Sequence, residues 1–281
     1  MTAEVDIRQW IGKTDSRRDV IAAWPAKALS ATLDRDDTDP IEGATLPQGW
    51  HWLYFLEARR ASEVGADGHP KRGGFLPPVA LPRRMWAGGR IEFKHPLRIG
   101  DAVQRDSEIL KVEEKTGGTG RLVFVTVRHT LKVGDTSAIV EEQDIVYREA
   151  AKPGDVPPPG KPAPSAPAWT RLVSPDPVLL FRYSALTFNG HRIHYDKDYA
   201  TGEEHYRGLV VHGPLQTTLL LDLCRRHAAQ PLKRLEYRAM QPLFHDQPFT
   251  VNGQPDSGTS KAELWTANAA GQYAMRGTAY F

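Results

Sequence analysis

Residues 209–227, Leu-Val-Val-His-Gly-Pro-Leu-Gln-Thr-Thr-Leu-Leu-Leu-Asp-Leu-Cys-Arg-Arg-His, predict an apolar helix that opens at a glycine and a proline. Pro214 suits the first helical position, because its ring fixes φ and its missing N–H would be unpaired there anyway. Gly213 lets a ligand approach the backbone closely, where free N–H groups and the positive end of the helix dipole lie. The stretch therefore predicts a central helix, Pro214 to His227, whose start can bind a negatively charged oxygen.

A loop rich in histidine precedes this helix. Residues 188–196 read Phe-Asn-Gly-His-Arg-Ile-His-Tyr-Asp, and about fifteen residues separate His194 from Leu209. Imidazole exchanges protons near neutral pH, so His194 is the candidate for proton transfer. Asn189 can orient water but cannot exchange a proton at neutral pH. We expect the proton-transfer group and the free backbone donors of the helix to meet at one site.

Composition limits the class of protein. The chain has 281 residues, 40% hydrophobic content and a formal net charge of +2. This mixed charge disfavours nucleic acid or a membrane surface as the main partner. No stretch approaches the roughly twenty apolar residues that cross a bilayer, and no export signal is seen. The lone Cys224 cannot form an internal disulfide, so we expect a soluble, cytoplasmic protein.

A proline-rich segment divides the chain into halves of similar size. Seven prolines lie between Lys152 and Pro167. Proline fixes φ and removes a backbone donor, which excludes a helix and favours a semi-rigid, extended spacer. The sequence therefore predicts an N-terminal domain at 1–150, a linker at 151–168 and a C-terminal domain at 169–281.

Both halves follow the same order of patterns, although their identity is low. A helix-like segment leads to an apolar helix and then to a strand that ends at a Pro-Leu corner, and three more strands follow. Val123, Val125 and Val127 alternate with other side chains, as in a half-buried antiparallel strand. The predicted class is α+β, with an antiparallel sheet wrapped around a central helix in each half. The expected segments are 18–33, 50–64, 90–93, 108–113, 121–132 and 139–148, then 177–187, 214–227, 235–240, 249–252, 261–267 and 272–281.

The second half resembles the MaoC-like hydratase and hydroxyacyl-thioester dehydratase type 2 group of hotdog folds. That group carries the active-site pattern Asp-x-Asn-Pro-x-His, whose last position falls on His194. Its first position falls on Asn189, and His191 and Arg192 stand where the pattern has Asn-Pro. The departures imply that His194 carries most of the acid–base work.

The resemblance extends over nearly the whole chain. Residues 73–78, Gly-Gly-Phe-Leu-Pro-Pro, and 83–89, Arg-Arg-Met-Trp-Ala-Gly-Gly, are similar to the mesaconyl-C4-CoA and itaconyl-CoA hydratase branch. It implies a double hotdog, in which a degenerate N-terminal hotdog precedes a catalytic one. The acidic segment 34–37 stands in the first half where the second has its histidine loop, so we expect one active site per chain. A homodimer is also implied.

The implied activity is that of a hydro-lyase acting on an α,β-unsaturated acyl-CoA. Water must attack the β-carbon while negative charge builds on the thioester oxygen. We expect His194 to take a proton from water and return one to the α-carbon, while Asn189 holds the water. Backbone N–H groups near Gly213 would stabilise the enolate oxygen.

Substrate binding is expected to involve arginine, because a branched C5 dicarboxylic acyl group carries a free carboxylate that suits a planar guanidinium. Arg192 is the first choice, since it shares the histidine loop, and Arg182 is a further candidate. The predicted substrate-binding residues are His191, Arg192, His212, Arg83, Arg84 and Trp86. We expect no cofactor beyond the coenzyme A of the substrate, and no metal.

The metal prediction depends on spacing, because His191, His194, His205 and His212 match no compact zinc signature. Two alternatives to the hydratase remain open for the function. One is a 3-hydroxyacyl-thioester dehydratase of fatty acid synthesis, and another is a non-catalytic module that binds acyl-CoA. A hotdog thioesterase is less favoured, because Asp222 sits deep in the central helix. Because one fold hosts several chemistries, the function must be inferred from the groups in the histidine loop and at the start of the helix.

Overall fold

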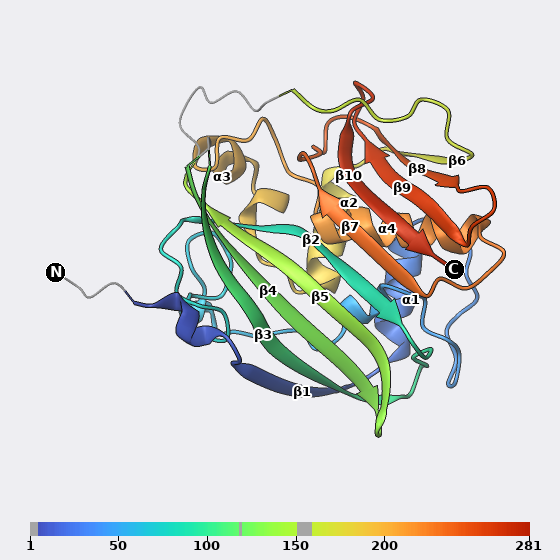
Figure 1. Cartoon of the computed structure of the whole chain (residues 1–281), viewed down its shortest axis with the longest axis horizontal. Helices are drawn as coiled ribbons and strands as arrows, with labels where there is room; N and C mark the ends of the chain where they lie inside the picture. Colours follow the sequence, from blue (N-terminus) through green and yellow to red (C-terminus); the bar gives the residue numbers. More distant parts are fainter. Residues whose placement is uncertain (1–4, 118–119, 151–158) are drawn as a thin grey trace.

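The computed structural model describes residues 5–117, 120–150 and 159–281. In these ranges the strands form one ten-stranded antiparallel sheet in the order β1-β3-β4-β5-β2-β7-β10-β9-β8-β6 (Figure 1). The α+β class predicted from the sequence is confirmed. The strands are β1 (Thr14–Val20), β2 (Arg83–Phe93), β3 (Ala102–Gly117), β4 (Gly120–Val133), β5 (Thr136–Arg148), β6 (Trp169–Val173), β7 (Arg234–Ala239), β8 (Phe249–Pro255), β9 (Lys261–Ala267) and β10 (Tyr273–Tyr280).

The helices are short, apart from the one that opens at Gly213. Four are α-helical and four are 3-10 turns, within the described ranges. No helix in that part of the chain is both long and apolar enough to cross a membrane. The helices are α1 (Ala23–Thr32), α2 (Pro177–Leu186), α3 (Lys197–Gly202) and α4 (Gly213–His227), and the 3-10 turns are η1 (Ile7–Trp10), η2 (Trp50–Leu53), η3 (Ala61–Glu63) and η4 (Arg192–His194).

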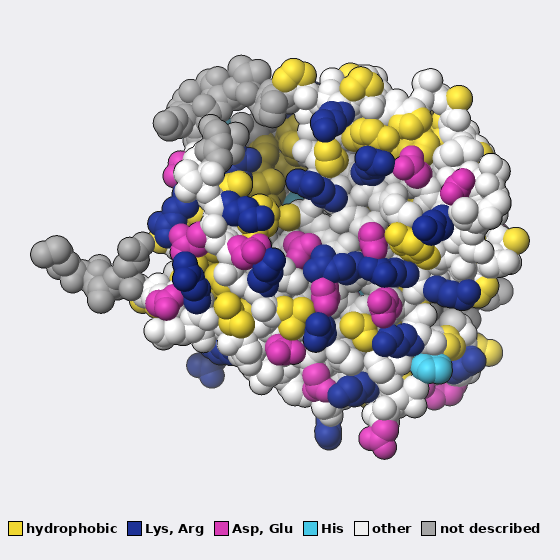
Figure 2. All heavy atoms as spheres, viewed as in Figure 1, with side chains coloured by type: hydrophobic (Ala, Val, Ile, Leu, Met, Phe, Trp, Pro, Cys, Tyr) yellow, Lys and Arg dark blue, Asp and Glu magenta, His cyan; other side chains and the backbone are white. Residues whose placement is uncertain are grey.

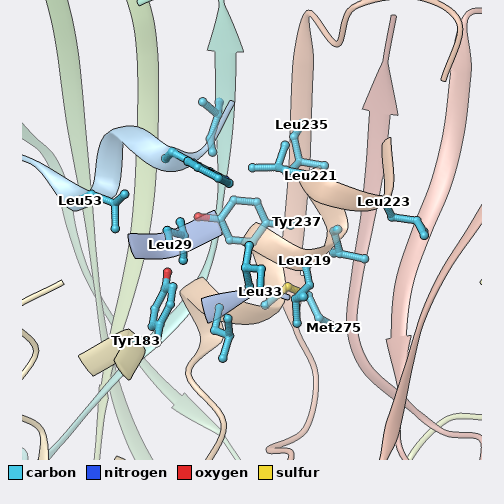
Figure 3. Packing of buried hydrophobic residues seen from close by; sticks show 14 of the residues in the cluster. Leu29, Leu33, Leu53, Tyr183, Leu219, Leu221, Leu223, Leu235, Tyr237 and Met275 are labelled. Atoms are coloured by element: carbon cyan, nitrogen blue, oxygen red, sulfur yellow. The ribbon is translucent and has the colours of Figure 1, made fainter. Parts of the chain in front are cut away.

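Helix α4 forms the centre of the second half, as predicted. Pro214 lies in its first turn, and Arg225, Arg226 and His227 lie in its last turn, where positive charge complements the helix dipole. Its apolar side chains pack against the strands of the second half and against first-half residues in one continuous core (Figure 3). Residues of this core include Leu29, Leu33, Leu53, Leu219, Leu221, Leu223, Leu235, Tyr237 and Met275.

The halves join through the pairing of β2 with β7. The pairs run from Gly88 with Arg238 to Glu92 with Arg234, so one sheet crosses the boundary between the halves. The predicted division at 1–150, 151–168 and 169–281 stays a prediction, and residues 151–158 lie outside the described part. Lys161 and Ala163, at the described end of the predicted linker, hydrogen-bond to Tyr273 and Gly271. That end therefore lies against the second half.

The predicted helix at 50–64 is wrong. Only η2 is helical at its start, and Phe55 takes a left-handed φ of 59°, which a continuing right-handed helix does not allow. The Trp52 indole and the Tyr54 hydroxyl are bound to Glu141 and to the Ala22 carbonyl, so tertiary contacts hold this segment in its turn. The first half therefore lacks a long central helix.

Two further predictions need correction. The helix expected over 18–33 is a strand followed by a helix, because residues 14–20 pair with β3 before α1 begins. Strand β6 is absent from the prediction, since its five residues end a proline-rich segment. On the face seen in Figure 2, Lys and Arg side chains lie among Asp and Glu side chains, in agreement with the mixed composition.

Candidate active site

A large cavity of about 2910 Å³ is lined by both halves of the molecule. The histidine loop, the start of α4 and strand β2 form part of its wall, and the inner face of β3, β4 and β5 forms another part. The predicted residues Asn189, His191, His194, Gly213 and Trp86 all line it. The structure therefore brings the predicted acid–base loop and the predicted helix start to one place.

His194 is held in one orientation by the backbone that leads into α4. Its Nδ1 lies 2.7 Å from the Val210 carbonyl oxygen. A carbonyl only accepts, so we assign the proton to Nδ1, which leaves the lone pair on Nε2. Nε2 has no hydrogen-bond partner among the described residues. Burial lowers the pKa of His194 to about 4, so the ring is a neutral base at physiological pH.

His212 supports His194 from behind. The two rings stack with centroids 3.6 Å apart and planes 18° apart. His212 has no exposed surface, does not line the cavity, and pairs its Nε2 with the Ser184 hydroxyl at 2.8 Å. The substrate contact predicted for His212 is therefore corrected: its ring fixes the plane of the neighbouring imidazole.

The start of α4 provides the backbone donors. Gly213 is the first residue of the helix, where N–H groups have no intrahelical acceptor, and it lines the cavity. A Cβ atom there would lie 3.6 Å from the Trp86 Cβ, which is ordinary contact. The packing around residue 213 thus leaves room for a methyl group. The advantage of glycine is therefore that a ligand in the cavity can approach its backbone closely. The Trp86 indole donates to the Tyr237 hydroxyl at 3.0 Å, which fixes the ring beside Gly213.

Asn189 is engaged by its own loop. Its Oδ1 accepts the backbone N–H of His191 at 3.0 Å, and its own N–H donates to the Ser184 carbonyl at the end of α2. Such a turn is a common use of asparagine. This contact uses one of the two lone pairs of Oδ1, and Nδ2 has no hydrogen-bond partner among the described residues. Asn189 can therefore donate a hydrogen bond to water or to the thioester oxygen.

An aspartate and a histidine from the first half, which were not predicted from the sequence, complete this cluster. The His69 Nδ1 lies 3.1 Å from an Asp67 carboxylate oxygen, and the His69 ring packs on the His191 ring with centroids 4.1 Å apart. The His191 ring in turn meets the His194 ring edge-on at 5.4 Å. Burial would raise the pKa of Asp67, but His69 holds it below its usual range. Burial lowers the pKa of both His69 and His191.

The backbones of the two halves touch where Asp67 meets the histidine loop. Gly68 has a φ of +86°, and a Cβ on it would lie 1.8 Å from the Gly190 carbonyl oxygen. Only glycine combines this conformation with so close an approach. The Asp67 carbonyl also accepts the Arg192 N–H at 3.0 Å. We call this contact between residues 66–68 and 190–192 the glycine seam.

Arg192 belongs to the seam and does not line the cavity. Its guanidinium binds Asp196 at 2.8 Å, donates to the Ala66 carbonyl at 3.0 Å and stacks on Tyr199. Its predicted role as the ligand of a substrate carboxylate is therefore corrected. Arg182 also stands outside the cavity lining, exposed on α2.

The remaining predicted arginines have different surroundings. Arg83 is buried, paired with Glu204 at 2.7 Å and stacked on Tyr206. Arg84 lines the cavity and lies close enough to His69 and His191 for its charge to lower the pKa of both imidazoles. Within the described ranges Arg84 has no carboxylate partner. Its guanidinium interacts with the Tyr147 hydroxyl. Of the two predicted arginines that line the cavity, Arg84 is the one whose charge is not paired with a carboxylate.

Polar side chains cover the inner face of the first-half sheet, where the missing helix leaves space. Glu141 accepts hydrogen bonds from His51, Trp52 and Gln143 at 2.7–3.0 Å. Burial would raise its pKa, but the His51 interaction holds it below the usual range. The Ser107 hydroxyl pairs with His129 at 2.8 Å nearby. We call the five residues His51, Ser107, His129, Glu141 and Gln143 the polar floor, and all of them line the cavity.

The segment 34–37 has no such opening. Arg35 pairs with Asp37 and with Asp222 of α4, and Asp222 also binds Arg171 and Arg226. Asp222 is buried and does not line the cavity, so it is a structural carboxylate. The arrangement agrees with one active site per chain and gives no support to the thioesterase alternative.

Metal ligands occur together once within the part of the chain that the structure describes. Potential ligand atoms of Asp67, His69 and His191 lie within 4.8 Å of one another. This set differs from the four histidines weighed in the sequence. The His69 Nδ1 is already bound to Asp67, and the rings of His69 and His191 pack with their planes 39° apart. The absence of a metal stays a prediction.

Known proteins match this chain over most of its length. A family model described as hydroxyacyl-thioester dehydratase type 2 matches residues 49–245. Mesaconyl-C(4)-CoA hydratase of Chloroflexus aurantiacus is 47% identical over 254 residues, covering 90% of this chain and 91% of the relative. A mitochondrial hydroxyacyl-thioester dehydratase type 2 of Schizosaccharomyces pombe is 28% identical, with 83% and 88% covered.

Solved structures support the fold. A MaoC-like dehydratase from Phytophthora capsici has a TM-score of 0.67 at 11% identity, covering 99% of this chain and 98% of that one. A Mycobacterium tuberculosis protein described as a double hotdog has a TM-score of 0.60 at 14% identity, covering 96% of both chains. The predicted double hotdog is confirmed.

Proposed function

The chain belongs to the hydroxyacyl-thioester dehydratase type 2 family, and from this membership we propose that it adds water to mesaconyl-C4-CoA to give citramalyl-CoA. The family and the hydro-lyase class predicted from the sequence are confirmed. The substrate is the further step, and it follows the printed activity of the Chloroflexus aurantiacus relative.

Arg84 is the observation that carries the choice of substrate. In mesaconyl-C4-CoA the free carboxylate is bonded to the β-carbon, which is the atom that water attacks. That carboxylate must therefore lie beside the imidazole cluster. Arg84 stands beside His69 and His191 and lines the cavity, and it lacks a carboxylate partner within the described ranges. A guanidinium that has no carboxylate partner and lies beside neutral rings favours an anionic ligand.

The polar floor supports a short, polar acyl group over a fatty chain. A long alkyl tail that entered the first half would lie against these polar side chains and could not hydrogen-bond to them. A polar acyl group can form such hydrogen bonds. This observation weighs against the fatty acid synthesis alternative.

The reaction follows from the groups that line the cavity. The thioester oxygen binds the Gly213 N–H at the positive end of α4. As the water oxygen bonds to the β-carbon, the electron pair of the double bond moves toward the thioester and forms the enolate. The Nε2 of His194 takes the proton that water loses. The imidazolium then gives a proton to the α-carbon, which restores neutral His194 and completes the hydration.

A substrate panel tests the proposal. Purified protein is incubated with mesaconyl-C4-CoA, itaconyl-CoA and crotonyl-CoA, loss of the enoyl-thioester absorbance is followed, and products are identified by mass. We expect the gain of one water on mesaconyl-C4-CoA. A preference for crotonyl-CoA would place the protein with fatty acyl dehydratases, and inertness on all three would favour a binding module.

Replacing Arg84 with Ala tests the carboxylate site. Losing one partner of a hydrogen-bonded charge pair costs about 2–5 kcal/mol, so kcat/KM for mesaconyl-C4-CoA should fall about thirtyfold or more. The value for crotonyl-CoA should change little, because that substrate has no carboxylate. Arg192→Ala is the matched control and should affect both substrates alike. Equal losses on both substrates with Arg84→Ala would refute the role of Arg84.

The homodimer and the cytoplasmic location implied by the sequence stay predictions. Trp24 on α1 and Phe181 on α2 are 69% and 62% exposed, and they are candidates for a subunit contact. Light scattering on the purified protein would determine the oligomeric state.

A further inference from the structure

The attacking water has two O–H bonds, and a well-oriented water needs an acceptor for each. The Nε2 of His194 can take one proton, since its Nδ1 donates to Val210. The Asn189 Oδ1 already receives the His191 N–H, so only its second lone pair could accept the other proton. The His191 ring lines the cavity, but no hydrogen bond within the described ranges fixes which of its nitrogens carries the proton. The histidine loop therefore supplies no second acceptor whose lone pair is fixed in place.

The first half supplies a group with the required atom. In His69, Asp67 accepts the Nδ1–H at 3.1 Å, which leaves the lone pair on Nε2. The backbone N–H of His69 donates to the same carboxylate at 3.0 Å, so Asp67 holds both the backbone and the ring. His69 lines the cavity, and its Nε2 has no hydrogen bond within the described ranges.

The glycine seam fixes this pair relative to the site. Asp67 and Gly68 contact Arg192 and Gly190 through backbone atoms, one and two residues from His69 in the chain. The His69 ring also packs on His191, which meets His194. Backbone contact on one side and ring packing on the other hold the His69 ring close to His194, near enough for its charge to lower the pKa of His194.

We propose that His69, oriented by Asp67, accepts the second hydrogen bond of the attacking water and so takes the place of the aspartate that Asn189 replaces. The inference depends on the proposed hydration and adds a catalytic residue from the other half of the chain. His194 remains the group to which the proton moves. His69 accepts a hydrogen bond only, so no proton is gained or lost beyond the step already described.

Three substitutions at His69 test the role. The side-chain oxygen of His69→Gln stands near the position of Nε2, whereas that of His69→Asn stands near Nδ1. His69→Ala should lower kcat roughly a hundredfold, as expected for a misoriented reactant, with little change in KM. His69→Gln should retain about tenfold more activity than His69→Ala or His69→Asn, since one ordinary hydrogen bond is restored.

Controls separate this role from a structural one. His95→Ala removes an exposed imidazole and should leave kcat unchanged. Thermal unfolding of each variant shows whether the fold persists, and we expect it to, because the seam is made by backbone atoms. Equal losses of kcat in all three His69 variants, or a change in KM with kcat unchanged, would overturn the inference while leaving the proposed hydration intact. A wild-type protein that hydrates none of the three thioesters would overturn the proposed function as well.

Discussion

Replacing Gly68 with Ala tests whether the glycine seam positions the catalytic groups. The new Cβ would lie 1.8 Å from the Gly190 carbonyl oxygen, whereas ordinary contact begins near 3.4 Å. Neither atom belongs to a flexible side chain, so one backbone segment must retreat by about 1.6 Å. The segment that moves carries either His69 or the histidine loop.

The size of the effect can be worked out in two parts. A left-handed φ costs an alanine roughly 1–2 kcal/mol, which lowers the melting temperature by about 2–4 °C per kcal/mol in a chain of this size. The displacement adds to this cost and acts on catalysis. A misplacement of about 1 Å can reduce a rate roughly a hundredfold, so kcat should fall by about that factor.

Gly12→Ala is the matched control for this experiment. Gly12 has a φ of +81°, and a Cβ there meets nothing within 4 Å. The two variants thus share the conformational penalty and differ in the clash. Hydration of mesaconyl-C4-CoA and thermal unfolding are measured for both. If Gly68→Ala were as active as Gly12→Ala, the seam would not position the active site.

Two further predictions concern the base and the helix start. Because burial lowers the pKa of His194 to about 4, Nε2 stays unprotonated at neutral pH, so kcat should be level from about pH 6 to 8. It should fall toward pH 4 as the imidazole gains a proton, and a pH–rate profile with a limb near pH 6.5 would contradict the buried, neutral base. Gly213→Ala should fold normally, since its Cβ would be 3.6 Å from that of Trp86, and yet lose kcat because the methyl group obstructs the thioester oxygen. Unchanged kcat in a folded Gly213→Ala protein would exclude the Gly213 N–H as an oxyanion donor.

Local sequence patterns predicted most strands of the sheet and helix α4, whose start lines the cavity. Alternation along residues 121–132 and the Gly-Pro start of α4 are properties of short segments, and the structure has both. The helix expected at 50–64 failed because its apolar pattern is also satisfied by a turn whose aromatic residues are bound elsewhere. Phe55, at a φ of 59°, stops the helix, and a sequence pattern does not report such tertiary contacts.

The site was predicted in part for the same reason. His194 and Gly213 lie in one contiguous stretch of the second half, so their meeting could be inferred. Asp67 and His69 lie more than a hundred residues earlier, and their role depends on how the halves dock. The sequence Gly-Ala-Asp-Gly-His at 65–69 does offer a signal, an acid between two glycines and an imidazole directly after the second glycine. The carboxylate-binding role predicted for Arg192 was wrong, because closeness to the histidines in the sequence does not determine the direction of its side chain.

One sheet continues from the first half to the second through β2 and β7, and Leu53 and Leu219 belong to one core. The two halves should therefore unfold together. Neither half can open without exposing the apolar surface of the other. Heat or denaturant should therefore remove structure and activity in a single cooperative step, in which no half-unfolded form accumulates. A substitution that destabilises the first half would then lower the activity of the second half, because it lowers the fraction of molecules that are folded. This holds even where the substituted residue does not contact the active site.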